Sequence, residues 1–384
     1  MSNYNMRFIM EYIFYIFILQ LIIYSKSEPL TVKLLGVVFR HGDRVPDSGR
    51  ESYPNDPYKN DSYYPLIHGE LNNSGKQHEF NLGIQLRKEY DDFLGDIYYH
   101  RDVFARSTDY RRTKMSLQLV LSGLYPPKKT QIWNPYLNWQ PTITTYVHGD
   151  YDNLLIPEEC PQFLKELETV QKLPEIQQKL KDFGPLLKNL TNLTGKLINT
   201  STDMYDLYNS LSAQKSMGLE LPRWAEDMIP DGPLLDGILF NYKIVHYNEK
   251  LLRLNGGMIL RHLVENMKNI QQNKKTPKVH LLSGHETNVV AILNTLKVFK
   301  PHVPEYSSAV VVELLQNNTS YFVKIRYYKG IPSESELEDL KIPGCTILCP
   351  FEQFMPLMKN MIPTDDEMIC KKTGSLYRVG KPEY

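Results

Sequence analysis

Hydrophobic residues along the chain gather in short runs, and each run ends in polar or charged residues. The run at 32–39 is almost wholly apolar and rich in β-branched residues, which predicts a strand buried on both faces of a parallel sheet. Similar runs occupy 102–105 and 278–282. A segment with helical periodicity follows each of them, as expected for repeated strand, loop and helix units.

The spacing of apolar residues also predicts helices and a hairpin. Helical spacing covers 75–94, 110–121 and 289–296, while the runs at 308–315 and 321–328 resemble two strands of an antiparallel hairpin at the sheet edge. Between 136 and 235 the chain changes character, and apolar residues recur mostly at helical spacing. We interpret this segment as an insertion that covers the mouth of a crevice.

These elements predict an α/β fold with a doubly wound, mainly parallel sheet flanked by helices. The sheet is expected to be formed by 28–135 and 236–384, with the mostly helical insertion at 136–235 between them. One interrupted sheet explains the pattern better than two independent domains, because no long linker separates the parts.

The three predicted strands all end in side chains that carry chemistry. Parallel strands bind ligands at their carboxyl ends, so these side chains are expected to converge on one crevice. Arginines around an uncharged imidazole suit an oxyanion such as phosphate, which the ring nitrogen can attack. The side chains are Arg40, His41 and Arg44 after the first strand, Arg106 after the second, and His285 and Glu286 after the third.

The overall charge favours a small-molecule partner. Lysine and arginine number 44 and are balanced by 44 aspartate and glutamate residues. This balance gives no electrostatic case for binding nucleic acid.

The first 27 residues have the pattern of a cleaved secretory signal. Arg7 precedes an apolar run at 12–24, and Ser25 and Ser27 supply small residues before the expected cleavage site. The run is shorter than the roughly 20 residues of a membrane-spanning helix. We therefore predict a secreted, extracellular chain that begins near Glu28 and has no membrane anchor.

Other features agree with secretion. Four cysteines, an even number, favour disulfides in an oxidising compartment over a metal site, although four cysteines allow three pairings. Glycosylation motifs are also frequent. They lie at Asn60, Asn72, Asn189, Asn192, Asn199, Asn317 and Asn318.

Three motifs in order resemble the histidine acid phosphatases, the secreted branch of the histidine phosphatase superfamily. They are Arg-His-Gly-Asp-Arg-Val-Pro at 40–46, Arg-Ser-Thr-Asp at 106–109 and Ser-Gly-His-Glu-Thr at 283–287. The likeness is greatest to the insect venom-type enzymes. It continues through 71–75, 82–87, 123–127, 160–163, 221–225 and 344–345, so it covers nearly the whole mature chain.

The resemblance implies an acid phosphatase that hydrolyses phosphate monoesters, including phosphorylated peptides, through a phosphohistidine on His41. It implies that Glu286 protonates the leaving group and that no metal or cofactor is needed. A homodimer is expected because the family often forms dimers. The implied phosphate ligands are Arg40, Arg44, Arg106 and His285, and the implied disulfides are Cys160 to Cys370 and Cys345 to Cys349.

Two positions depart from the family pattern. Glu286 stands where most of the secreted family has aspartate, so the proton donor is one methylene longer. A carboxyl of similar pKa can still donate a proton. Arg111 stands where the family usually has aspartate before its Arg-Thr pair, which adds a cation beside the pocket.

Other interpretations of the same residues remain open at this point. Arg106 would have only a structural role if it paired with Asp109 or Glu79. The fold also suits a phosphomutase or another phosphoryl transferase. A catalytically inactive secreted binding protein or venom component is the alternative from outside the enzymes, and Glu286 is its one hint in the sequence.

Overall fold

The structure is a computed structural model that describes residues 30–318, 320–330 and 337–370. The predicted signal segment at 1–27 lies outside the described residues. Within them, no helix is both long and apolar enough to cross a membrane.

The described residues form an eight-stranded sheet in the order β3-β2-β4-β1-β5-β6-β7, with β8 paired to β6. The strands β3, β2, β4 and β1 run parallel, whereas β5 to β8 continue the sheet in antiparallel pairs. The predicted α/β fold with its sheet and flanking helices is therefore confirmed. The strands are β1 Thr31–Arg40, β2 Val103–Ser107, β3 Thr145–Tyr146, β4 Val279–Gly284, β5 Ala309–Asn317, β6 Ser320–Tyr328, β7 Glu338–Leu340 and β8 Cys349–Pro350.

The predicted hairpin is present as β5 and β6, but it does not end the sheet. β5 pairs with β1, and the short strands β7 and β8 both pair with β6 on the far side. The sequence did not predict β7 and β8 because two or three residues are too few to reveal a period.

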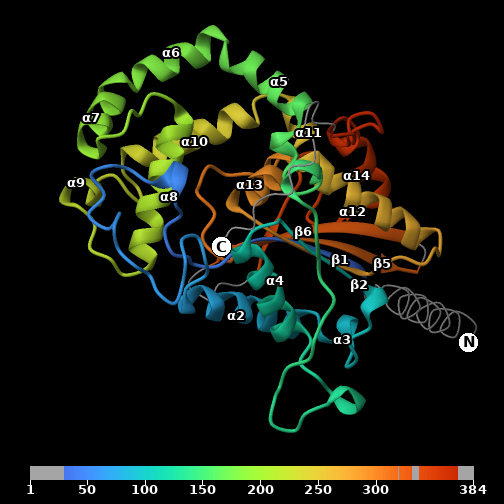
Figure 1. Cartoon of the computed structure of the whole chain (residues 1–384). Helices are drawn as coiled ribbons and strands as arrows, with labels where there is room; N and C mark the ends of the chain where they lie inside the picture. The colour runs from blue at the N-terminus through green and yellow to red at the C-terminus, as the bar shows by residue number, and fades with distance from the viewer. Residues whose placement is uncertain (1–29, 319, 331–336, 371–384) are drawn as a thin grey trace, which may run out of the picture.

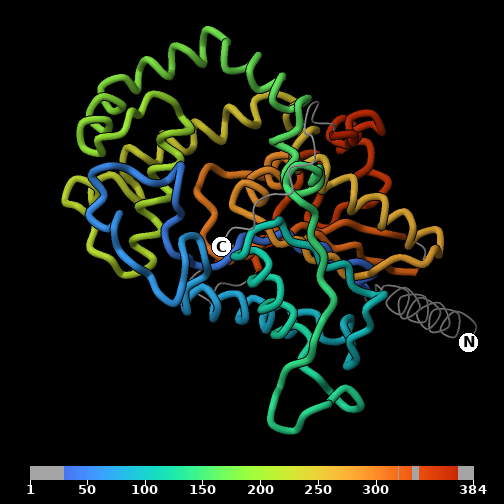
Figure 2. The backbone as a smooth tube through the Cα atoms, viewed as in Figure 1, coloured from blue at the N-terminus to red at the C-terminus, as the bar shows by residue number. Residues whose placement is uncertain are grey.

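Helices cover both faces of the sheet (Figures 1 and 2). Along β1, Leu35 and Val37 face one core with α2 and α4, while Leu34 and Val38 face the other with α12 and α13. This alternation explains why the β1 sequence is apolar at nearly every position. The helices of the two layers are α2 Asn73–Glu89, α3 Asp91–Leu94, α4 Arg111–Leu124, α11 Glu249–Leu254, α12 Gly256–Gln271, α13 Glu286–Thr295 and α14 Phe351–Met358.

The insertion lies at one side of the sheet, where its helices arch away from the two layers (Figure 1). Its helices are α5 Pro161–Gln171, α6 Pro174–Asp182, α7 Gly184–Thr194, α8 Ser201–Ser216, α9 Arg223–Glu226 and α10 Pro233–Val245. Part of the insertion has a core of its own, centred on α8 and α10, whereas Phe163 and Val170 of α5 belong to the core that α12 and α13 form with the sheet. The segment before α5 is not helical except for short turns, and the predicted boundary at 235 falls inside α10.

A stretch near the N-terminus also belongs to this side of the molecule. The backbone trace in Figure 2 shows the blue segment after β1 running beside the insertion helices. Arg50 contacts Asp206 of α8, and the side-chain amide of Gln214 donates to Asp56. The space above the strand ends is thus enclosed by the chain after β1 as well as by the insertion.

Candidate active site

The carboxyl ends of β1 and β4 open into a cleft of about 590 Å³. His41, Arg44, His285 and Glu286 all line it, so the structure brings together residues that the sequence places up to 245 positions apart. The opposite wall comes from η1 Gly49–Glu51, η5 Pro157–Glu159, α5, α8 and α10.

His41 is held with one ring nitrogen facing the cleft. Its Nδ1 lies 2.8 Å from the carbonyl oxygen of Gly42, and since a carbonyl only accepts, Nδ1 carries the proton. Nε2 is then unprotonated, and it makes no hydrogen bond with a described residue. A nitrogen lone pair is therefore free for attack on an electrophile.

The turn that carries His41 depends on a glycine. A Cβ atom at Gly42 would lie 2.4 Å from the backbone oxygen of Gly75, at the start of α2. The loop after β1 can pack against this helix only without a side chain there. The glycine of the Arg-His-Gly motif thus fixes the position of the histidine before it.

The surroundings keep His41 uncharged. Burial lowers its pKa well below the usual histidine value, and the nearby charges of Arg112, Arg40 and Arg44 lower it further. The ring therefore stays neutral, and able to act as a nucleophile, in acidic solution.

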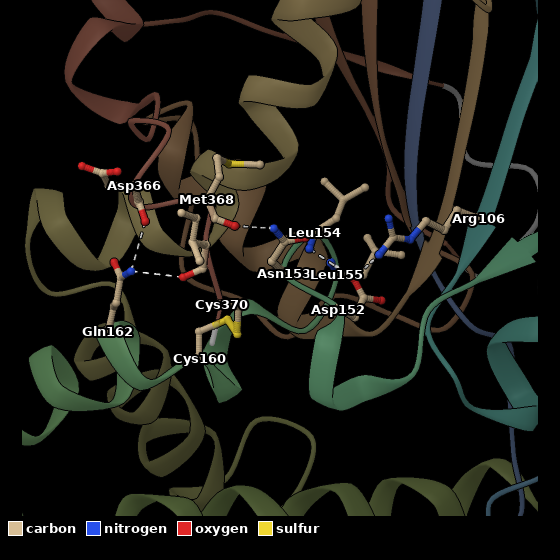
Figure 3. Close-up of a disulfide and its surroundings, with 11 residues drawn as sticks. Arg106, Asp152, Asn153, Leu154, Leu155, Cys160, Gln162, Asp366, Met368 and Cys370 are labelled. Carbon is tan, nitrogen blue, oxygen red and sulfur yellow. Dashed lines mark hydrogen bonds and ion pairs between the residues drawn. A yellow bond between two sulfur atoms is a disulfide. The ribbon is translucent and has the colours of Figure 1, made fainter. Parts of the chain in front are cut away.

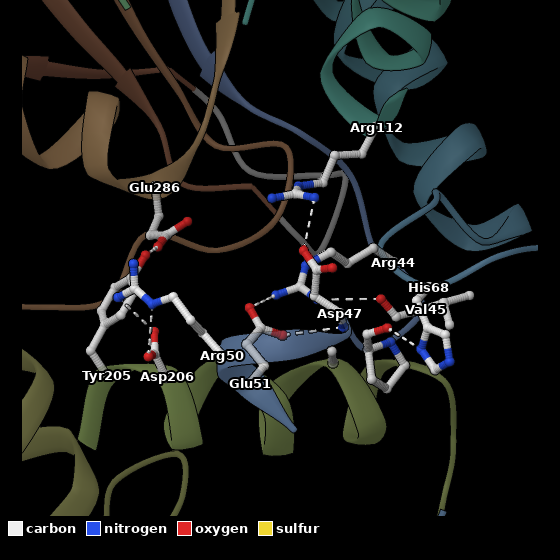
Figure 4. Close-up of polar contacts among 12 residues, drawn as sticks. Arg44, Val45, Asp47, Arg50, Glu51, His68, Arg112, Tyr205, Asp206 and Glu286 are labelled. Carbon is white, nitrogen blue, oxygen red and sulfur yellow. Dashed lines mark hydrogen bonds and ion pairs between the residues drawn. The ribbon is translucent and has the colours of Figure 1, made fainter. Parts of the chain in front are cut away.

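Arg44, which is buried, and Arg112, which is half-buried, supply positive charge to the cleft that His41 also lines. Figure 4 shows both guanidinium groups with their acidic partners. The Nη2 of Arg44 donates to Glu51 Oε1 at 2.6 Å, and the Nη1 of Arg112 donates to Asp47 Oδ2 at 3.2 Å. The Arg112 guanidinium also lies over the Tyr110 ring, 4.6 Å from its centroid. The Nη1 of Arg44 also donates to Val45 O at 3.2 Å, whereas the Nε atoms of both arginines have no hydrogen-bond partner among the described residues and so remain available to an anion in the cleft.

Arg106, which the sequence led us to expect at the phosphate site, does not line the cleft. Its Nη2 forms an ion pair with Asp152 Oδ1, and the Asp152 side chain is fully buried. Alternation along β2 puts Arg106 on the same face as Phe104, whose ring packs against His262 of α12. The structure thus places Arg106 outside the cleft lining and pairs it with Asp152 rather than with Asp109 or Glu79.

Arg112 is the cleft residue that the sequence analysis missed. It lies in the first turn of α4, the helix that follows the carboxyl end of β2. The same place in the third unit holds Glu286, in the first turn of α13. This correspondence between the two strand-helix units could have indicated Arg112 from the sequence. Side chains of the first helical turn lie at the same edge of the sheet as the residues of the preceding loop. Arg111, the unusual cation, is not among the cleft residues.

His285 occupies the position before α13 and faces His41. The ring centroids are 5.4 Å apart with the planes nearly perpendicular, and Nε2 lies 3.1 Å from Thr108 Oγ1. Burial, then Arg112, lower its pKa to about 3. His285 is therefore neutral at the cleft. It can donate a hydrogen bond to an anion, but it adds no positive charge.

Glu286 has contacts on two sides. The Tyr205 hydroxyl of α8 donates to Oε1, and the Nε of Arg40 lies 3.5 Å from Oε2. Burial alone raises the pKa of this carboxyl, but Arg40, the Tyr205 hydrogen bond and His285 outweigh burial and leave the pKa below the usual value. Tyr205 was not predicted as a site residue, because nothing in the sequence of α8 connects it with Glu286.

Arg40 lies behind the cleft rather than in its lining. Its Nη1 donates to Pro304 O at 2.6 Å, and its guanidinium lies 4.0 Å from the centroid of the Tyr306 ring. Arg40 therefore acts on the site through its charge and through Glu286. No group of three or more metal-ligating side chains occurs among the described residues.

The two disulfides expected from the family are both present. Cys160, just before α5, is joined to Cys370 (Figure 3). Cys345 is joined to Cys349. The first disulfide joins two parts of the chain that are 210 residues apart in sequence. The second closes a local turn, because its cysteines are only 4 residues apart.

The predicted glycosylation positions differ in exposure. One of them conflicts with the fold: Asn72 is 7 % exposed, and its side chain caps α2 by accepting from Gly75 N at 2.8 Å. A glycan needs an accessible amide nitrogen, so Asn72 is unsuited to carry one. Asn317 is half-buried, and the exposed positions are Asn60, Asn189, Asn192, Asn199 and Asn318.

Comparisons with known proteins agree with one another. The family model described as histidine phosphatase superfamily (branch 2) matches residues 31–328. A venom acid phosphatase of Apis mellifera is 46% identical over 343 residues, which cover 89% of this chain and 88% of that protein. Human prostatic acid phosphatase is 35% identical over 353 residues, which cover 90% and 89%.

Solved structures show the same fold. A phytase from Klebsiella sp ASR1 superposes with a TM-score of 0.66 at 15% sequence identity, over 90% of this chain and 100% of that one. At this identity the likeness concerns the arrangement of the sheet and helices.

Proposed function

This chain belongs to branch 2 of the histidine phosphatase superfamily and is an acid phosphatase, and we propose that it hydrolyses phosphate monoesters in two steps through a phosphohistidine on His41. The observation that carries this proposal is the state of the His41 ring. Nδ1 is bonded to Gly42 O, Nε2 faces the cleft, and the nearby cations keep the ring neutral.

In the first step, His41 Nε2 attacks phosphorus, the N–P bond forms and the bond from phosphorus to the ester oxygen breaks. Arg44 and Arg112 donate to the nonbridging oxygens and neutralise the charge that gathers there. His285 adds a neutral donor, and Arg40 adds positive charge from behind the cleft. These arginines stay protonated at any working pH, so the site needs no change of state to bind phosphate.

Glu286 donates a proton to the leaving oxygen in this step. The positive charge of Arg40 helps to hold the pKa of Glu286 low, and a bound phosphate dianion offsets the positive charge of the site and raises the pKa of the carboxyl again. In the second step, water attacks phosphorus, the N–P bond breaks and Glu286 takes a proton from the water. Phosphate leaves, and Glu286 is protonated again.

Replacing His41 tests the proposal directly. We expect His41→Ala to lower phosphate release from an aryl phosphate by at least about 10⁴-fold, because no other nucleophile lies at that point. Rapid quenching of the wild type with labelled substrate should trap an acid-labile, alkali-stable phosphoenzyme that the variant lacks.

His100→Ala is the matched control, since His100 is exposed and lies outside the cleft. It should keep wild-type activity. Substantial turnover by a folded His41→Ala enzyme would refute the nucleophile assignment.

Secretion and dimer formation belong to the same proposal. Two disulfides and several exposed glycosylation motifs support an extracellular enzyme. A loop with exposed Trp133, Tyr136 and Ile143 supports a contact with a second copy, because such apolar clusters mark interaction surfaces. Expression of the full chain in insect cells, followed by N-terminal sequencing and light scattering of the medium fraction, tests both.

A further inference from the structure

The loop at 152–160 is fixed at both ends and forms part of the cleft wall (Figure 3). At its start, Asp152 pairs with Arg106 and accepts from the backbone N–H groups of Leu154 and Leu155. In its middle, the Leu155 carbonyl accepts from Asn288 of α13 at 2.8 Å. At its end, Cys160 is tied to Cys370. The loop is thus a rigid part of the site.

This loop places Glu158 in the same cleft as His41 and Glu286. Glu158 forms no ion pair with a described residue, and its Oε2 atom is buried without a hydrogen-bond partner among them. A buried carboxylate oxygen that lacks a partner is costly, so it gains from any ligand group that donates a hydrogen bond or carries positive charge.

The charges of the cleft are divided in a way that bears on substrate choice. The acids near the catalytic groups are paired: Glu51 with Arg44, Asp47 with Arg112 and Asp206 with Arg50. No lysine lines the cleft in the described part of the chain. Beyond the phosphate-binding cations the wall therefore offers Glu158, together with apolar side chains of α5 such as Phe163.

We propose that Glu158 is a specificity-determining residue, which makes the enzyme prefer phosphate monoesters whose leaving group is positively charged over those whose leaving group is neutral or negative. The inference rests on the proposed function, because phosphate bound at Arg44 and Arg112 directs the leaving group toward the rest of the cleft. It also gives Arg106 a role: Arg106 positions the loop that carries Glu158.

The preference depends on pH. Burial, with the neighbouring acids Glu159, Asp152 and Glu286, raises the pKa of Glu158 to about 7. The other groups that face it are Tyr110, which precedes α4, and the uncharged residues of α5. Glu158 is neutral below this pKa and negative above it, so the selection for positive charge grows as the pH rises through about 7.

The test compares two esters of the same shape. Choline phosphate and 3,3-dimethylbutyl phosphate have the same shape and differ in the positive charge, which also lowers the second pKa of the phosphate group. Glu158→Gln retains this substrate effect, so the ratio of the two kcat/KM values in the wild type, divided by the same ratio in Glu158→Gln, isolates the effect of Glu158. We expect this quotient to favour choline phosphate and to rise about 3- to 10-fold between pH 5.5 and 8.

Glu168→Gln is the matched control, because Glu168 is an exposed acid of α5 outside the cleft, and it should keep the wild-type ratio. Glu158→Asp retains the charge and should keep the rise with pH. A quotient of wild-type to Glu158→Gln ratios that stays near 1, or that does not change with pH, overturns this inference while leaving the phosphatase activity in place. Absence of phosphate release from either ester would instead refute the proposed function.

Discussion

The two sides of the cleft are built from different parts of the chain and contribute different chemistry. The phosphate side, at the ends of β1 and β4 and the first turns of α4 and α13, carries His41, Arg44, Arg112, His285 and Glu286. The cap side, formed by η1, η5, α5, α8 and α10, carries mainly carboxylates, hydroxyls and apolar groups, and its arginine, Arg50, is paired with Asp206. The other two arginines of the cleft, together with the imidazoles of His41 and His285, therefore lie on the phosphate side.

The difference teaches that the cap side sets the state of the groups on the phosphate side. Glu51 of η1 holds the Arg44 guanidinium, and Tyr205 of α8 donates to Glu286. The residues that touch the reacting atoms are therefore supplied by the sheet, whereas their orientation, their ionisation and the choice of leaving group are controlled by the cap side. Substitutions on the phosphate side and on the cap side should therefore change different measured quantities, and by different amounts.

The largest effect is expected where a cation is removed from the phosphate side. Arg112→Ala should lower kcat/KM for an aryl phosphate by about 10²- to 10³-fold, because one preorganised donor to the phosphoryl oxygens is lost. The free energy of unfolding should change little, since the partner Asp47 is 30% exposed and can be solvated. Steady-state kinetics and thermal unfolding measure the two quantities.

Arg106→Ala is the matched comparison, because it removes the same group from a position outside the cleft. It leaves the fully buried Asp152 without its partner, so we expect the free energy of unfolding to fall by about 3 kcal/mol, with less than tenfold loss of kcat/KM on an aryl phosphate. If Arg106→Ala lost activity without stability and Arg112→Ala did the reverse, the division of roles between the two arginines would be contradicted.

A smaller effect is expected when the proton donor is replaced. Glu286→Gln should reduce hydrolysis of an alkyl phosphate by about 10²-fold, because the alkoxide then leaves without a proton. An aryl phosphate with an acidic phenol needs no such proton and should be affected far less. The measurement is kcat for a series of esters of increasing leaving-group pKa, and equal losses along the series would exclude Glu286 as the donor.

The comparison also separates what the sequence could predict from what it could not. The sheet, the flanking helices and the residues His41, Arg44, His285 and Glu286 were accessible because each of these side chains follows an apolar run directly. Local order along the chain was enough to place them at one edge. Arg112 was missed because the prediction used the last residues of each strand and ignored the first helical turn, and Arg106 was misplaced because its orientation depends on alternation along β2.

The cap side was predicted only in outline. A mostly helical segment was evident from its periodicity, yet the contacts of Tyr205 with Glu286 and of Arg106 with Asp152 join residues 81 and 46 positions apart. Such contacts depend on how distant parts of the chain pack against one another. Neither the hydrophobic periodicity nor a local sequence motif specifies this packing. The burial of Asn72 has the same origin, since its motif specifies a sequence and not an environment.

The smallest of the expected effects concerns the contact between the two sides. The Tyr205 hydroxyl donates to the ionised form of Glu286 and so favours it, which lowers the pKa of the carboxyl. Tyr205→Phe removes this hydrogen bond, so the pKa should rise and Glu286 should stay protonated to higher pH. The basic limb of kcat for an alkyl phosphate should therefore move upward by about 1 pH unit.

Tyr242→Phe is a matched control, because the buried Tyr242 hydroxyl has no hydrogen-bond partner among the described residues. Both variants lose one hydroxyl from the same wall of the cleft, but only Tyr205→Phe loses a bond to the carboxyl. A shift of the limb in both variants would indicate a general change in the polarity of the wall. A shift to lower pH in Tyr205→Phe would mean that the tyrosine stabilises protonated Glu286, and control of the donor by the cap side would then act in the opposite direction.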